Sequence, residues 1–181
     1  MTTLRCKLVT LIWLCVAATA VGAGQAGPDP ASRPRVTVET AYGDIVIALR
    51  PDKAPETVRN FLAYVDSGHY DNTTFHRVIE HFVIQAGGYD AAYEPLPEGE
   101  PIPNEASNGL SNEEGTVAME KVDEDPHSAT DQFFINLKNN WYLDHSSETR
   151  LGWGYCVFGR VVEGLDVARE IAAVETGAVG E

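Results

Sequence analysis

Arg77 and Gln85 are the residues whose types and setting point to chemistry. They lie in the stretch 75–88, which reads Phe-His-Arg-Val-Ile-Glu-His-Phe-Val-Ile-Gln-Ala-Gly-Gly, so one cation and one amide stand among aromatic and β-branched residues. A guanidinium is charged at any biological pH and is seldom left among apolar side chains without a carboxylate or a ligand. Arg77 is therefore a candidate for donating hydrogen bonds to a bound ligand. The alternative, which composition alone favours, is a surface arginine on the polar face of a strand.

His76 and His81 lie in this stretch and His69 lies shortly before it, and the three are candidate metal ligands. Their spacing matches no common metal site, and no scheme of paired cysteines or carboxylates accompanies them. We therefore expect that the protein uses no metal and no other cofactor.

Two further function classes are disfavoured. Ser128, Asp144 and His145 have the residue types of a hydrolytic triad, but no nucleophile-elbow glycine pattern surrounds the serine, so a hydrolase is the weakest of the functions considered. The formal net charge is −14. A surface that is so acidic disfavours binding to nucleic acid and to anionic lipid.

The elements that position Arg77 and Gln85 can be predicted from the surrounding pattern. By spacing alone the stretch 75–83 is ambiguous, because its apolar residues fall on one face of a 3.6-residue period. The shortness of the run, its β-branched and aromatic content and the turn-rich flanks argue against a helix. We predict two short strands with a tight bend near Glu80 and His81.

The rest of the chain has the pattern of a mostly β domain with two helices. Val58, Phe61, Leu62 and Val65 recur at helical spacing after Pro55, which predicts a helix over 55–66 that covers one face of the core. The other predicted elements are strands at 36–40, 44–50, 115–120, 132–136 and 155–163, a helix at 165–174, long loops at 87–114 and 122–131, and an irregular segment at 138–154.

Residues 1–23 have the pattern of a secretory signal peptide, with Arg5 and Lys7 before an apolar run and small residues after it. Cleavage after Ala20 and cleavage after Ala23 are both compatible with the sequence. The apolar run is shorter than the roughly 20 residues that a membrane-spanning helix needs. We expect a flexible linker at 24–35, a single domain at 36–181, and a periplasmic or otherwise exported protein that is not bound to membrane after cleavage. Cys156 would then be its one cysteine, and no intramolecular disulfide could form.

The stretch 75–88 resembles the signature of the cyclophilins, the cyclosporin-binding class of peptidyl-prolyl cis-trans isomerases. Further similarities follow in the family's order, from about residue 36 to about residue 174, and the closest similarity is to bacterial periplasmic members. They are Asn60-Phe61, Gly68 and Tyr70, Thr74, Asn104-Glu105, Gly109-Leu110, residues 115–119 (Gly-Thr-Val-Ala-Met), residues 132–136 (Gln-Phe-Phe-Ile-Asn), Leu143-Asp144 and residues 157–162 (Val-Phe-Gly-Arg-Val-Val).

The resemblance implies a fold, an activity and a set of site residues. The fold would be a cyclophilin-like antiparallel β-barrel, and the activity would be rotation about X-Pro bonds in unfolded or flexible exported proteins. Arg77, Gln85 and His76 match the family's catalytic positions. The matching substrate-binding positions are Phe82, Val83, Met119, Glu120, Gln132, Phe134, Tyr142, Leu143 and Tyr155. The alternative function is that of a non-catalytic peptide-binding chaperone on the same fold, which would not need the arginine.

Several positions depart from the family's pattern. Val83 stands where many members have methionine, and Glu120-Lys121 stands where a small residue and a neutral or basic one are common. Tyr142 aligns with the tryptophan that contacts cyclosporin, so we expect weak cyclosporin binding. From the resemblance, we also expect the family's closing C-terminal strand to be missing here. We therefore expect one edge of the 36–40 region to have unpaired amides and carbonyls.

Overall fold

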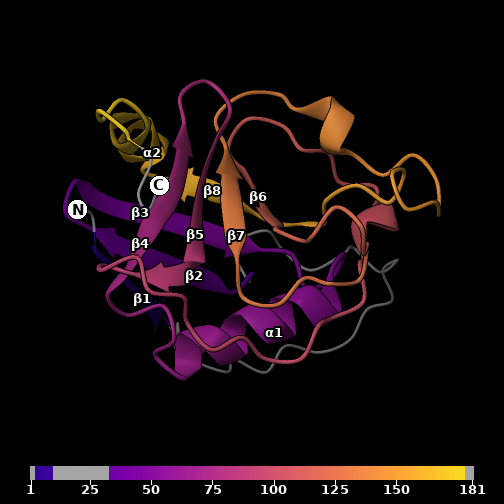
Figure 1. Cartoon of the computed structure of the whole chain (residues 1–181), viewed down its shortest axis with the longest axis horizontal. Helices are drawn as coiled ribbons and strands as arrows, with labels where there is room; N and C mark the ends of the chain where they lie inside the picture. Colours follow the sequence, from indigo (N-terminus) through magenta and orange to yellow (C-terminus); the bar gives the residue numbers. More distant parts are fainter. Residues whose placement is uncertain (1–2, 10–32, 178–181) are drawn as a thin grey trace, which may run out of the picture.

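The structure is a computed structural model in which residues 3–9 and 33–177 are described. In this part of the chain, eight strands follow one another around a closed antiparallel barrel in the order β1-β2-β3-β8-β6-β7-β5-β4 (Figure 1). Helices α1 (Pro55–Asp66) and α2 (Leu165–Ala172) lie on opposite sides of the strands. The prediction of a mostly β, cyclophilin-like architecture with two helices is confirmed.

The predicted hairpin is formed by β2 (Arg35–Thr40) and β3 (Gly43–Leu49). Residues that alternate along each strand point into the barrel, as the period of two requires. Val36 and Val38 on β2 and Ile45, Ile47 and Leu49 on β3 are fully buried. These side chains form one wall of the hydrophobic core.

Helix α1 covers this core as predicted. Proline occupies its first turn, where a missing amide is tolerated, and the apolar face with Val58, Phe61 and Val65 is buried. The Phe61 ring centroid lies 5.3 Å from that of Phe133 and 5.0 Å from that of Phe158, so the helix contacts strands from distant parts of the sequence. The helix ends before Gly68, which has the left-handed φ of 73°.

The ambiguous stretch forms two strands and a tight bend. β4 (Thr73–Ile79) and β5 (Val83–Asp90) are antiparallel neighbours. His81 in the bend has a φ of 58°, a left-handed conformation that no helix would contain. The two-strand prediction is therefore confirmed. The apolar residues fall at helical spacing by coincidence, because both faces of this strand pair carry apolar side chains.

β5 continues further than predicted, and the loop that follows begins after Asp90 and not at residue 87. The reason is a close crossing of two backbones. A Cβ atom on Gly87 would lie 2.7 Å from the carbonyl oxygen of Asp131, and one on Gly88 would lie 2.6 Å from the side chain of Gln132. The two glycines are thus strand residues that let the segment before β7 pass closely, where the sequence pattern suggested a turn.

The remaining strands, β6 (Thr116–Met119), β7 (Phe133–Asn136) and β8 (Val157–Glu163), agree with the predictions to within two residues. Two short 3-10 helices, η2 (Ala106–Asn108) and η3 (Trp141–Leu143), were not predicted and lie in segments expected to be loop or irregular. The long loop before β6 is attached to α1 through Glu105, whose carboxylate accepts hydrogen bonds from the Thr57 amide and hydroxyl, both at 2.8 Å.

No helix among the described residues is long and apolar enough to span a membrane.

The outer edge of β2 differs from the expectation. β1 (Thr3–Val9) runs antiparallel to β2, with Arg5 opposite Glu39 and Val9 opposite Arg35, and Thr3 on the same strand lies opposite Thr74 of β4. The prediction of an unpaired edge at 36–40 is therefore wrong for this chain. Residues 3–8 alternate polar and apolar types, a pattern suited to a strand, and the backbone groups at the edge of β2 can pair with any extended segment.

Most of the predicted signal peptide, residues 10–23, and most of the predicted linker, residues 24–32, lie outside the described residues. The leader, its cleavage point and the linker therefore remain predictions. Their bearing on the barrel is direct, because cleavage after residue 20 or 23 would remove β1 together with the leader.

Candidate active site

One row of facing residues crosses four neighbouring strands. Arg77 on β4 lies opposite Gln85 on β5, Gln85 lies opposite Phe134 on β7, and Phe134 lies opposite Ala118 on β6. Residues directly opposite each other in a sheet point to the same face. The register therefore brings the guanidinium, the amide and an aromatic ring together, although they are far apart in the sequence.

This row lies on the face of the sheet that points away from the main core. Ile84 and Ile135, which alternate with row residues along β5 and β7, belong to the main core and are fully buried. Val83, Ala118, Phe134 and Val157 form a second, smaller apolar cluster, and each is at most 3% exposed. Because these apolar side chains are buried from solvent, they can form the apolar floor of a ligand site.

Polar contacts hold the two candidate catalytic groups in place. One terminal nitrogen of Arg77 donates a hydrogen bond of 3.2 Å to the Gln85 side-chain oxygen, and the Gln85 amide donates one of 3.0 Å to the side-chain oxygen of Gln132. The Arg77 guanidinium carbon also lies 5.8 Å from the centroid of the Phe82 ring. Arg77 is solvent-exposed, so it remains free to donate further hydrogen bonds to a ligand.

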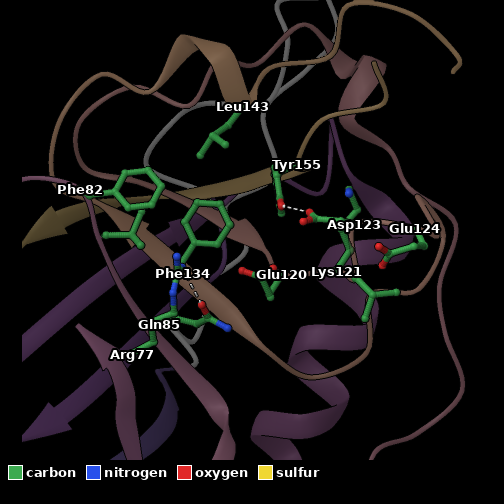
Figure 2. A pocket seen from close by; sticks show the side chains of 12 residues that line it. Arg77, Phe82, Gln85, Glu120, Lys121, Asp123, Glu124, Phe134, Leu143 and Tyr155 are labelled. Carbon is green, nitrogen blue, oxygen red and sulfur yellow. Dashed lines mark hydrogen bonds between the residues drawn. The ribbon is translucent and has the colours of Figure 1, made fainter. Parts of the chain in front are cut away.

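A cavity of about 440 Å³ opens over this face (Figure 2). Eight of the predicted site residues line it: Arg77, Phe82, Val83, Gln85, Glu120, Phe134, Leu143 and Tyr155. Figure 2 shows Phe82, Phe134 and Leu143 gathered at one end, with Arg77 and Gln85 beside them. The sequence-based expectation thus corresponds to one continuous site with an apolar part and a polar part.

Four predicted residues lie outside the cavity lining. Gln132 contacts the site through Gln85, as described above. His76 is packed against Tyr89, with ring centroids 4.6 Å apart. Met119 is 2% exposed in the main core, and Tyr142 is 70% exposed at the rim, where it stacks on Phe82 at a centroid distance of 6.2 Å.

The segment just before β7 is fixed by buried polar contacts. Asp131 is fully buried, and one of its carboxylate oxygens lies 2.9 Å from the Nε2 atom of His69. The Tyr70 hydroxyl donates a hydrogen bond of 2.7 Å to the Asp131 carbonyl. These contacts fix the backbone next to Gln132, and through it the amide of Gln85. His69 therefore has a structural partner in this protein, and it does not contribute to the cavity.

Four lining residues were not predicted: Lys121, Val122, Asp123 and Glu124. Asp123 accepts a hydrogen bond of 3.1 Å from the Tyr155 hydroxyl, and the Lys121 ammonium lies 4.6 Å from the centroid of the Tyr155 ring. The acidic run at 123–125 directly after a predicted strand was the available signal. The sequence did not indicate that the loop folds back over the site.

Burial shifts the protonation equilibria of several groups around the cavity toward the neutral form. Burial raises the pKa of Glu120, and it raises the pKa of Tyr155, where the carboxylates of Glu120 and Asp123 add to the effect. Burial lowers the pKa of His76, which is therefore neutral at pH 7. Arg77 and Lys121 are accordingly the cationic donors that line the cavity.

No group of three or more histidine, cysteine, aspartate or glutamate side chains in the described residues could hold a metal ion. His69, His76 and His81 have separate surroundings. His69 pairs with Asp131, His76 packs on Tyr89, and the largely exposed His81 lies 3.3 Å from the Glu80 carboxylate.

Comparison with known proteins identifies the family of this site. Residues 35–180 match the family described as cyclophilin type peptidyl-prolyl cis-trans isomerase/CLD. Peptidyl-prolyl cis-trans isomerase cyp18 of Streptomyces antibioticus is 56% identical over 142 residues, which cover 78% of this chain and 85% of that protein. The chain belongs to the cyclophilins. Peptidyl-prolyl cis-trans isomerase B of Escherichia coli (strain K12) is 54% identical to this cyclophilin over 145 residues, covering 80% and 88% of the two chains.

A solved relative agrees in fold. The crystal structure of a Cryptosporidium parvum cyclophilin, obtained in the presence of the dipeptide Ala-Pro, matches this cyclophilin with a TM-score of 0.65 and 26% identity. The match covers 79% of this chain and 87% of the other. Membership of the family decides between the two functions that the sequence left open. The protein is a peptidyl-prolyl cis-trans isomerase (EC 5.2.1.8), and the non-catalytic chaperone alternative is set aside.

Proposed function

We propose that this cyclophilin isomerises X-Pro bonds in unfolded or flexible exported proteins, with Arg77 as the catalytic cation. The observation that carries the proposal is the direct cross-strand pairing of Arg77 with Gln85, at the edge of an apolar floor that includes Phe134. Arg77 combines a permanent charge, a fixed neighbour and access to the cavity. A surface arginine without function would need none of these surroundings.

The reaction places few demands on the protein. Rotation about the X-Pro bond has a barrier of about 18–20 kcal/mol because amide resonance must be broken, and no covalent bond to the substrate forms or breaks. In the twisted state the prolyl nitrogen regains its lone pair. A donor that already points at that nitrogen and at the prolyl carbonyl stabilises this state more than the planar one. Arg77 has the chemistry for this role at any biological pH.

The other catalytic and substrate-binding roles follow from position. Gln85 orients the Arg77 guanidinium and can hydrogen-bond the substrate backbone, and Gln132 fixes the orientation of the Gln85 amide. The neutral His76 lies on β4 next to Arg77 and adds no competing charge. Met119 has its side chain in the core, so its role in the site would be through its backbone on β6.

The apolar end of the cavity has the properties that a proline ring needs. Val83 is 1% exposed and Phe134 is 3% exposed, and Phe82 and Leu143 pack beside them. Tyr142 and Tyr155 flank this end through their ring contacts with Phe82 and Phe134. The crystallisation of the C. parvum relative with Ala-Pro supports a proline-containing ligand for the same fold.

The exported location rests on the signal-like sequence of residues 1–23. To test export, the full chain is expressed in a bacterium that has a periplasm, and the N-terminus of the mature protein is determined in each cell fraction. A mature protein that begins after Ala20 or Ala23 and is found outside the cytoplasm would support export. A cytoplasmic protein that retains residues 1–23 would contradict it.

The client class is tested with two refolding proteins. One has a slow refolding phase limited by prolyl isomerisation, and the other is a proline-free variant of the same protein. We expect the purified cyclophilin to accelerate only the first, at substoichiometric amounts. Equal acceleration of both would show that it assists folding by binding chains, and the proposed client reaction would be wrong.

A further inference from the structure

The cavity extends well past the place proposed for the proline ring. Figure 2 shows the aromatic end formed by Phe82 and Phe134, then Glu120, and then Asp123 and Glu124 at the opposite end. A bound peptide whose proline occupies the apolar end must therefore place a flanking residue against an acidic wall. We call Glu120, Asp123 and Glu124 the acidic wall; Glu120 matches a substrate-binding position of the family, but the charge of the wall has no role assigned so far.

In the part of the chain that the structure describes, neither cation that lines the cavity forms an ion pair with the acidic wall. The Lys121 ammonium lies over the Tyr155 ring at 4.6 Å, and the Arg77 guanidinium is held by Gln85 at 3.2 Å. Among the described residues, neither Glu120 nor Glu124 forms an ion pair. The acidic wall therefore presents negative charge that the protein itself does not neutralise at contact distance.

Glu120 differs from the other two acids because it is partly buried, whereas Asp123 and Glu124 are exposed. In Figure 2 its carboxylate points toward Phe134, at the boundary between the apolar and acidic ends of the cavity. Burial raises the pKa of this carboxyl, which means that its ionised form lacks the solvation that it would have in water. A cation on a bound ligand would stabilise the ionised carboxylate of Glu120 in place of the missing water, whereas a carboxylate on the ligand would destabilise it further.

We propose that Glu120 is a specificity-determining residue that selects substrates with a lysine or arginine within two residues of the proline. This inference rests on the proposed function, because it assumes that the proline occupies the apolar end. Asp123 and Glu124 extend the favourable field toward solvent, where longer side chains reach. An acidic residue at the same substrate position would meet three carboxylates, and the one nearby ammonium is already placed over an aromatic ring.

The test measures kcat/KM by NMR exchange spectroscopy on five short peptides with one proline each. Alanine, lysine or glutamate precedes the proline in three of them, and lysine or glutamate follows it in the other two. At one of the two positions, before or after the proline, the wild-type kcat/KM for the lysine peptide should exceed that for the glutamate peptide by about tenfold, equivalent to about 1.4 kcal/mol. The ratio should fall at high salt, because part of the site is open to solvent.

The decisive variant is Glu120→Gln, which keeps the size of the side chain and removes its charge. We expect it to reduce the lysine-to-glutamate ratio of kcat/KM to within about threefold, at 1.36 kcal/mol per decade. The matched control is Glu175→Gln, which removes one negative charge beyond α2 from an exposed residue that does not line the cavity. This control should keep the wild-type ratio.

The outcomes separate this inference from the proposed function. If the alanine peptide is turned over but lysine and glutamate peptides react equally well at both positions, the acidic wall does not select substrate and the inference is wrong. The same holds if Glu175→Gln reduces the ratio as much as Glu120→Gln, since the effect would then come from net charge. A failure of the proposed site would appear instead as an Arg77→Ala variant that turns over the alanine peptide at the wild-type rate.

Discussion

Replacing Arg77 by alanine should abolish most of the isomerase activity and leave the fold nearly intact. The lost group is one charge-assisted donor aimed at a developing lone pair, and removal of one such donor from a preorganised site costs about 10²–10³ in kcat, or about 2.7–4 kcal/mol. We therefore expect kcat/KM on an alanine-proline peptide to fall by about two to three orders of magnitude.

The cost to the fold can be estimated from the contacts of the side chain. Arg77 is exposed, and its contacts are a hydrogen bond of 3.2 Å to Gln85 and a cation–π contact at 5.8 Å with Phe82. After the substitution, Gln85 keeps its bond to Gln132. Loss of an exposed cation–π contact and one surface hydrogen bond amounts to about 1 kcal/mol. For a domain of this size that corresponds to a decrease in Tm of about 2–4 °C.

Two further variants sharpen the experiment. Arg77→Lys keeps the charge but loses the planar fork, so its activity should lie between those of wild type and Arg77→Ala. Arg59→Ala removes an exposed arginine of α1 that pairs with Glu56 outside the cavity, and it should retain wild-type activity. Each variant is checked for folding by circular dichroism before kinetics. The reasoning would be refuted by a folded Arg77→Ala enzyme within threefold of wild type, or by equal losses in Arg77→Ala and Arg59→Ala.

Three other predictions concern the rim, the cavity and the barrel edge. Cyclosporin should inhibit weakly, because the exposed Tyr142 replaces an indole donor, and Tyr142→Trp should lower the inhibition constant; tight inhibition of wild type would contradict this. Because burial raises the pKa of Glu120, the folded state keeps that proton to higher pH than the unfolded chain does. Its contribution to stability is therefore complete below the unfolded pKa of about 4.3 and is lost as pH rises above that value. Glu120→Gln should lose less Tm than wild type as pH rises, and parallel Tm curves would disprove the assignment. Residues 24–181 should melt at least about 3 °C below the full chain, since β2 loses the strand paired with it, and equal melting temperatures would show that β1 adds no stability.

Local patterns in the sequence were sufficient for most of the helices and strands, whereas the residues of the apolar floor were identified through the resemblance to the family. The helix over 55–66 was predicted with its boundaries, because its apolar spacing, the proline at its start and Gly68 after its end are all local signals. The hairpin of β2 and β3 was readable for the same reason. The interpretation of 75–88 as two strands was also correct, since β-branched content and turn residues outweighed an accidental helical spacing.

Other features depend on contacts between segments that are distant in sequence. Gly87 and Gly88 were taken for a turn and proved to be strand residues, because the reason for the glycines is the backbone at Asp131 and Gln132, far along the chain. The strand that pairs with β2 came from residues 3–9, whose hydropathy pattern resembled a signal peptide. Residues 3–8 alternate in a way that suits a strand, but no local pattern indicates the partner in either contact, since strand pairing depends on register and position in the whole sheet.

The residue types of the row formed by Arg77, Gln85 and Phe134 were determined by the sequence alone, and the row itself by the tertiary structure. Arg77, Gln85 and Phe134 were identifiable as candidates from their types and from their resemblance to a family. That they face one another follows from the register of β4, β5 and β7, which the sequence does not encode locally. The acids of the wall can be read from the sequence directly after Met119. Only the folding of the loop after β6 over the sheet places Glu120, Asp123 and Glu124 in one cavity with Arg77. Side-chain chemistry is a property of each residue, whereas proximity is a property of the folded chain.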